Sequence, residues 1–363
     1  MPDVVKFPRD MISTLSLGSL GETSTSPCID LHRDVARTVD APQSHIEPIV
    51  QEPDFGEGVA ACAEEQPRDG RTDNLSGIVK SERKPLMSYA LILIDNPRPM
   101  VRRITLNRPD KRNALNNQLR TEVLKAVEEA DRDPEIRVSI LRGAGTCFSA
   151  GYDLAMNNTK EQPYYTAGGA GNWPRHVIEG SFRIWDMAKP VIAQVHGYCL
   201  AGASELATAC DLVYVAEDAQ IGYPPVRLIS PPDMHFHPWL MGMRAAMEAM
   251  LTGDAISGIE AARTGFANRA FPPAELEERV LEMAERVAKI PSDLQQMNKR
   301  SVHRAMEIMG ARAAIRAGTE LQALGMTTHA SREYMKQFSQ GVTHALSVRD
   351  KAFGDYRERE KKK

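Results

Sequence analysis

From Met87 onward, the hydrophobic pattern of this 363-residue chain alternates between short strands and amphipathic helices. The segments 89–95 (YALILID) and 101–107 (VRRITLN) read as two strands joined by a short Asn-Pro-Arg-Pro turn. Apolar residues then recur at helical spacing, and the next segment, 137–143 (RVSILRG), reads as a further strand. Because this alternation gives way to a mostly helical region beyond about residue 240, we expect a mixed α/β domain with a C-terminal helical extension.

The first 86 residues differ in composition from the remainder. They contain no Trp or Tyr, and their 15 acidic and 9 basic residues give them a formal charge of −6. A segment with few aromatic residues and excess charge rarely buries enough apolar surface to offset chain entropy. We therefore expect residues 1–86 to be a disordered extension, residues 87–340 to form the main domain with its C-terminal helices, and residues 341–363 to be a charged tail.

Charge and cysteine content narrow the possible partners. The net charge of −3 gives no electrostatic case for a nucleic-acid partner or an anionic membrane surface. The spacing of the five cysteines fits neither a zinc site nor a disulfide framework, and no stretch is apolar over the eighteen or so residues of a membrane span. These features predict a cytoplasmic protein, with a mitochondrial location as the alternative, that has no membrane span and no metal site.

Two glycine-containing stretches each follow a predicted strand. They are Cys147–Leu154 (CFSAGYDL) and Gly197–Leu206 (GYCLAGASEL), and the second follows a strand expected at 190–197. Gly and Ala let a ligand approach the backbone closely, and exposed amides at a loop or helix start bind anionic oxygens. Tight packing alone explains either stretch. Because the two occur together, about 50 residues apart, they favour an oxyanion hole with one amide from each loop.

Four ordered segments carry a resemblance to a known family. They are ITLNRPDKRNALN, FSAGYDL, HGYCLAGASELATACDLVYVAEDAQIGYPP and LTGDAISGIEAARTGFANRAFPP. Over residues 87–363 the chain resembles the crotonase (enoyl-CoA hydratase/isomerase) superfamily. The resemblance implies a spiral of ββα units with a C-terminal helical region that assembles into trimers or hexamers. It also implies an acyl-CoA substrate, with coenzyme A as part of the substrate and no tightly bound cofactor.

The same resemblance assigns the residues around the thioester. It implies that the thioester oxygen lies between the backbone amides of Tyr152 and Gly202, where an enolate places negative charge. Each donor of such a pair stabilises the charge by about 3–4 kcal/mol. The expected contacts to CoA and the acyl group come from Lys111, Arg112, Ala114, Ala150, Tyr152, Asp153, Leu154 and Tyr223. Lys111 and Arg112 are equally compatible with solvated surface charges, and the two tyrosines with plain packing.

The catalytic carboxylates depart from the family pattern. Glu205 matches the first of the two glutamates of the hydratases, whereas an ungapped count places Pro225 where the second is expected. Because proline exchanges no proton, a hydration that uses two carboxylates needs another group. Asp233, eight residues after Pro225, matches a catalytic aspartate of the dienoyl-CoA isomerases and the 4-chlorobenzoyl-CoA dehalogenases. An Asp at a Pro-Asp turn is also commonly structural.

Three hypotheses follow from these residues. The first is an enoyl-CoA hydratase-like enzyme with Glu205 as the acid/base. The second is an isomerase, or a hydrolase that cleaves a C–C or thioester bond, with Asp233 taking part. The third is a relative without catalytic activity that binds acyl-CoA or RNA. Because Glu205 and both oxyanion stretches are present, we favour an enzyme, and the resemblance implies that it forms a homo-oligomer.

Overall fold

The computed structural model describes the backbone of residues 89–154 and 172–354, with the side chains of all of these except residues 172–176. The described residues belong to one unit of the chain, residues 85–363. The N-terminal extension expected at residues 1–86 lies outside the described residues.

Among the described residues, six strands form the main sheet. In spatial order they are β1 (Ile92–Arg98), β2 (Val101–Leu106), β3 (Val138–Gly143), β4 (Val191–Val195), β6 (Leu212–Ala216) and β9 (Arg269–Phe271). β1 pairs with β2 in the antiparallel sense, and the other neighbouring strands are parallel. Each strand expected from the hydrophobic pattern is therefore confirmed. β1 continues past Pro97 because an edge strand tolerates a residue without an N–H, so the turn is shorter than predicted.

A second, three-stranded sheet consists of β5 (Tyr198–Leu200), β7 (Gln220–Gly222) and β8 (Ile256–Ser257). The chain passes from the main sheet into this sheet at β4–β5 and again at β6–β7, and it returns through a helix to β9. Two strands and a helix thus repeat along the chain. This arrangement confirms the predicted α/β spiral of ββα units.

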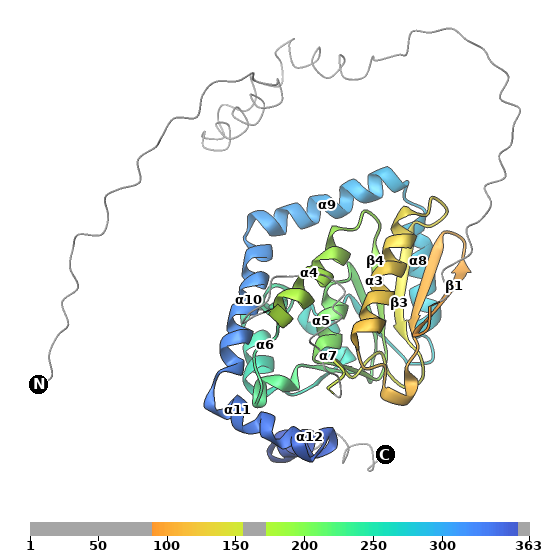
Figure 1. The fold of residues 1–363 in the computed structure, drawn as a ribbon. Coiled ribbons are helices and arrows are strands. Elements are labelled where there is room, and N and C mark those ends of the chain that lie inside the picture. Colours follow the sequence, from red (N-terminus) through yellow and green to blue (C-terminus); the bar gives the residue numbers. More distant parts are fainter. Residues whose placement is uncertain (1–88, 155–171, 355–363) are drawn as a thin grey trace, which may run out of the picture. The chain divides into compact units, whose positions relative to one another are not determined.

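Helices cover both faces of the main sheet (Figure 1). The first is α3 (Asn117–Arg132), whose residues Leu119, Val123, Val127 and Ala130 are buried as the helical spacing predicts. Asn116 caps this helix by accepting a hydrogen bond from the Leu119 amide at 2.8 Å. The α-helices that follow are α4 (Asn172–Asp186), α5 (Gly202–Thr208), α6 (His237–Thr252), α7 (Gly258–Thr264), α8 (Leu276–Ala288), α9 (Ser292–Ile308), α10 (Ala311–Met326), α11 (His329–Met335) and α12 (Val342–Asp350).

The C-terminal boundary differs from the expected one at residue 340. Residues 342–350 form α12, with Ala345, Arg349 and Asp350 buried. Arg227 in the 3₁₀ helix η4 (Pro224–Arg227) donates to Asp350 at 2.8 Å, and the two side chains are 1% and 5% exposed. The Asp350 carboxylate is thus paired inside the fold and does not belong to a solvated tail. The pairing was not visible in the sequence because the partners lie 123 residues apart.

Lys299 anchors α9 to the centre of the domain. Its ammonium group donates to the Asp211 carboxylate at 2.9 Å and to the backbone carbonyls of Ile184 and Lys189 at 3.4 and 3.2 Å. The Lys299 and Asp211 side chains are only 5% and 12% exposed. Because the Asp211 carboxylate lies away from water, its charge depends on this cation.

We expect Lys299→Met to lower the free energy of unfolding by about 3 kcal/mol, because it leaves the buried Asp211 carboxylate without its cation. Urea unfolding followed by circular dichroism measures the change. Lys289→Met, at an exposed lysine just after α8, is the matched control and should change stability by less than about 0.5 kcal/mol. Equal losses in the two variants would contradict an anchoring role.

Candidate active site

The two glycine-containing stretches meet in space. The Ser149 amide donates to the Tyr198 carbonyl at 3.0 Å, and the Leu200 amide donates to the Ser149 carbonyl at 3.3 Å. Gly151 has a φ of +98°, and a Cβ there would lie 2.6 Å from the Leu200 carbonyl oxygen and 3.4 Å from the Gly202 nitrogen. Only glycine fits this position, because both the backbone angle and the contact exclude a side chain.

α5 begins at Gly202, directly after a strained residue. Ala201 has φ 51° and ψ −125°, a conformation that costs a non-glycine residue about 1–3 kcal/mol. As the first residue of the helix, Gly202 has an amide with no intrahelical acceptor. A Cβ on Gly202 would lie 2.4 Å from the Tyr152 ring. The phenol ring therefore lies directly against the Gly202 backbone, at the start of the helix that carries Glu205.

The turn before α3 holds the first stretch in place. The Leu115 amide donates to the Gly151 carbonyl at 2.8 Å, and the Ala150 amide donates to the Arg112 carbonyl at 2.9 Å. The Asp153 carboxylate pairs with Arg108 at 3.0 Å. Asp153 and Ala150 thus have roles inside the fold that the sequence did not reveal.

The remaining residues expected to contact CoA lie around this turn. Lys111 and Arg112 are exposed, and the Arg112 guanidinium carbon is 5.4 Å from the centre of the Tyr198 ring. Ala114 is half-buried, and Leu154 is exposed at the end of the first described range. Two exposed basic side chains therefore lie in the turn whose backbone holds the first stretch.

Glu205 is held by donors on both of its carboxylate oxygens. The Tyr152 hydroxyl donates to Oε2 at 2.8 Å, and the Met234 amide donates to Oε1 at 3.2 Å. The residue is 1% exposed. Burial raises the pKa of Glu205 to about 7, although the hydrogen bonds from Tyr152 and Met234 and the charge of Arg120 favour the carboxylate and lower it. Glu205 can therefore gain or lose a proton near neutral pH.

Asp233 lies in the same buried site as Glu205. It is 2% exposed, and its Oδ1 has no hydrogen-bond partner among the described residues. Burial, together with the nearby Glu205 charge, holds the pKa of Asp233 well above its usual range, while Arg120 opposes this shift. α10 supports the loop from behind, because a Cβ on Gly318 would come within 2.8 Å of the Asp233 carbonyl oxygen. Asp233 is thus buried beside a second acid rather than exposed at a turn.

The segment after β7 contributes an aromatic side chain to the site. Tyr223 is 4% exposed, and burial together with the Glu205 and Asp233 charges holds the pKa of its phenol well above the usual range. Pro225 lies in η4, where its carbonyl accepts the amides of residues 228–230. This proline shapes the loop that leads to Asp233.

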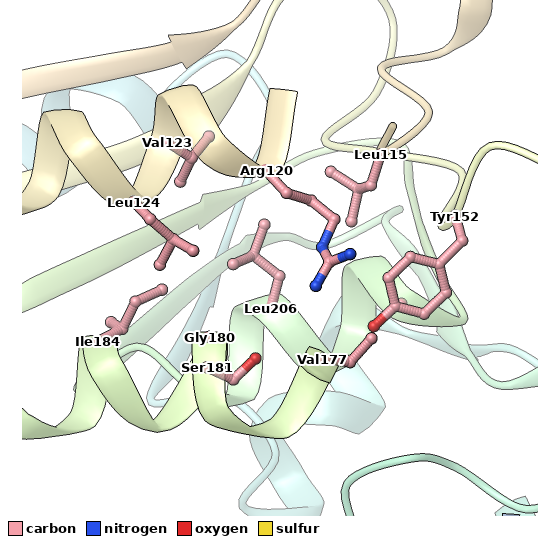
Figure 2. Close-up of a pocket in the computed structure, with 11 residues that line it drawn as sticks. Leu115, Arg120, Val123, Leu124, Tyr152, Val177, Gly180, Ser181, Ile184 and Leu206 are labelled. Carbon is pink, nitrogen blue, oxygen red and sulfur yellow. The ribbon is translucent and has the colours of Figure 1, made fainter. Parts of the chain in front are cut away.

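A pocket lies beside these groups, between α3, α4 and α5 (Figure 2). Gly202 and Tyr152 line it, and Arg120 of α3 extends its guanidinium into it. The other lining residues are mainly apolar: Leu115, Val123, Leu124, Val177, Gly180, Ser181, Ile184 and Leu206. Sequence reasoning missed Arg120. One indication of this placement was present in the sequence: Arg120 lies four residues before the buried Leu124, and therefore on the same side of the helix.

The described ranges contain neither a cluster of metal ligands nor a membrane-spanning helix. In residues 89–154 and 172–354, no group of three His, Cys, Asp or Glu side chains comes together as metal ligands. His235 and His237 flank the buried loop, and burial lowers the pKa of both, in His237 to about 4. Across the same ranges, no helix has the length and hydropathy needed to cross a bilayer.

Comparisons with known proteins show the family of this chain. Residues 98–345 match the family model described as enoyl-CoA hydratase/isomerase. EchA13 of Mycobacterium tuberculosis is 34% identical over 275 residues, which cover 68% of this chain and 84% of that protein.

Two solved structures extend the likeness to the fold. A crystal structure of an enoyl-CoA hydratase from Mycobacterium smegmatis is 28% identical, covers 74% of this chain and 96% of its own, and superposes with a TM-score of 0.68. An enoyl-CoA hydratase/isomerase from Xanthobacter autotrophicus Py2 is 32% identical, covers 74% of this chain and 100% of its own, and has a TM-score of 0.67. This chain belongs to the enoyl-CoA hydratase/isomerase family.

Proposed function

We propose that this enzyme acts on an enoyl-CoA thioester through an enolate, with Glu205 as the acid/base. The observation that carries the proposal is the position of Glu205, three residues after the Gly202 amide, with both carboxylate oxygens held by donors. The thioester oxygen would lie between the amides of Tyr152 and Gly202, which stabilise its developing charge. The close contact of the two glycine-containing stretches supports this pairing.

Hydration is the reaction that we propose first. Glu205 takes a proton from water as the water oxygen bonds to Cβ of the enoyl group, which gives an enolate held by the two amides. The proton is then delivered to Cα of that enolate. Because the pKa of Glu205 is about 7, both of its protonation states are available at neutral pH, as an acid/base requires. The exposed Lys111 and Arg112 are suited to the phosphates of CoA. We further propose that the active form is a homo-oligomer.

A second candidate reaction follows from Asp233. Two buried carboxyl groups in one site can remove a proton from one carbon and return it to another, which is a double-bond isomerisation. The buried position of Asp233 beside Glu205 favours this candidate over a role in the turn alone. Hydrolytic cleavage of a C–C or thioester bond is a related outcome that the same assay detects.

Glu205→Gln should lower turnover of enoyl-CoA substrates at least about a hundredfold, because the variant cannot exchange a proton. The assay incubates a panel of enoyl-CoAs with the enzyme and follows mass and retention. Hydration adds one water, and isomerisation changes retention without changing mass. Thioester hydrolysis releases free CoA, whereas C–C hydrolysis gives a shorter acyl-CoA. Glu217→Gln, at a glutamate outside the site, is the control. An unchanged rate in Glu205→Gln would contradict the proposed role.

Asp233→Asn should separate the two candidate reactions. If Glu205 supports hydration without a second acid, hydration should fall less than about tenfold, whereas isomerisation should fall at least about a hundredfold. The same panel measures both rates. Equal losses would mean that Asp233 acts only through Glu205, and no loss in either reaction would return Asp233 to a structural role in its turn.

The pKa of Glu205 also predicts how stability depends on pH. The pKa of Glu205 in the folded state, about 7, lies above its usual value of 4.5, so the folded state binds the proton more tightly. The contribution of Glu205 to stability should therefore be highest below about pH 4.5 and fall as the pH rises to about 7. Glu205→Gln should remove this loss. Between about pH 5 and about pH 8, its free energy of unfolding should therefore rise relative to that of the unchanged protein by on the order of 2 kcal/mol. Urea unfolding of both proteins at the two pH values measures the difference. If the stability of the two proteins changes with pH by the same amount, the prediction is contradicted.

A further inference from the structure

Arg120 brings a positive charge into a pocket that is otherwise mainly apolar. Figure 2 shows its guanidinium directed into the pocket toward Tyr152, with Leu206 close by. The residue is half-buried and lies on α3, directly after the buried Leu119. A charged group in such a place costs free energy unless it interacts with groups of opposite charge. Its surroundings therefore indicate its role.

The side chain of Tyr152 links Arg120 to the two carboxyl groups. The guanidinium carbon is 5.8 Å from the centre of the Tyr152 ring, and the Tyr152 hydroxyl donates to Glu205 at 2.8 Å. The other oxygen of Glu205 accepts the amide of Met234, the residue next to Asp233. A cation from α3, a phenol from the first loop and two carboxyl groups from α5 and the following loop thus form one cluster.

Among the described residues, Arg120 is the cation that acts on both acids of this cluster. Burial opposes the ionised form of both acids, and the Arg120 charge favours that form, which lowers the pKa of Glu205 and of Asp233. Burial also lowers the pKa of Arg120, and the charges of the two acids counteract that shift.

The other titratable groups around the cluster are neutral at neutral pH. Burial holds the pKa of the Tyr152 and Tyr223 phenols well above the usual range, and it lowers the pKa of His235 and His237. None of these side chains can therefore take over the role of the guanidinium.

We propose that Arg120 is a positioning residue that holds one negative charge on the Glu205–Asp233 pair near neutral pH. It acts on the two acids across Tyr152 and does not itself exchange a proton with the substrate. Without the guanidinium, burial would favour the protonated form of both acids more strongly, and less of the pair would be ionised near neutral pH. The catalytic consequence rests on the proposed function, whereas the charge state of the pair does not.

The kinetic test compares Arg120→Met with Arg120→Lys in the full-length chain. In Arg120→Met, the acid limb of kcat/KM against pH should move upward by about one to two pH units. Turnover should then fall at least about tenfold at pH ~6 and less than about twofold at pH ~9. Arg120→Lys keeps the charge and should largely restore the profile. Arg132→Met is the control on the same helix, because its side chain is 69% exposed, and it should leave the profile unchanged.

An infrared titration tests the same charge without turnover. The C=O stretch of protonated carboxyl groups is followed against pH, and the component lost in Glu205→Gln is assigned to Glu205. In Arg120→Met, the midpoint of this Glu205 component should move upward by about one to two pH units, as in the kinetic test. If the midpoint moves while no acyl-CoA is turned over by any form, the inference about Arg120 holds and the proposed function fails.

Two results would overturn the inference. One is an infrared midpoint that stays in place in a folded Arg120→Met, as judged by circular dichroism. The other is a loss of turnover that is equal at every pH, since a purely structural role would give that loss. Arg120→Gln, which removes the charge but keeps a polar side chain, replaces the Met variant if the latter does not fold, and the same two readouts apply to it.

Discussion

The site depends on the close contact of two backbone segments at Gly151 and Gly202. A Cβ at Gly151 would collide with the Leu200 carbonyl, and one at Gly202 would collide with the Tyr152 ring. Because neither position has a side chain, the loop after β3 lies directly against the start of α5. The same contact places the Tyr152 hydroxyl on Glu205. The strained backbone of Ala201 is tolerated at this point because packed elements on both sides hold it.

Burial of charge is the second constraint. Glu205 and Asp233 are withdrawn from water, which disfavours their ionised forms and raises the pKa of each. A fold selected for stability alone would fill such a site with apolar side chains, since buried charges seldom stabilise a protein. The cluster therefore supports the proposed chemistry, which needs a proton exchanged near neutral pH beside a developing negative charge. Lys299 with Asp211 and Arg227 with Asp350 show buried charges used differently, as links between segments that are distant in the sequence.

Much of the fold could be predicted from local pattern. The strands at β2, β3 and β4 and the buried face of α3 followed from the pattern of apolar residues, since each depends on neighbours along the chain. The C-terminal boundary could not be predicted in this way, because α12 is held by a pairing between Arg227 and Asp350. Arg120 was missed for a related reason. A long basic side chain on a helix normally reaches solvent, and only the packing of α4 and α5 beside it forms a pocket around its guanidinium.

The amino-acid sequence by itself determined the family, the two glycine-containing stretches and the presence of Pro225 where an ungapped count expects the second glutamate. These depend on residue type and spacing, which are properties of the chain alone. Tertiary structure decided which groups stand next to Glu205. Asp233 lies 28 residues further along the chain, while Tyr152 and Arg120 precede Glu205 by 53 and 85. Their effect on its pKa comes from burial and from Coulomb interactions, which depend on distance in space and not on separation in sequence.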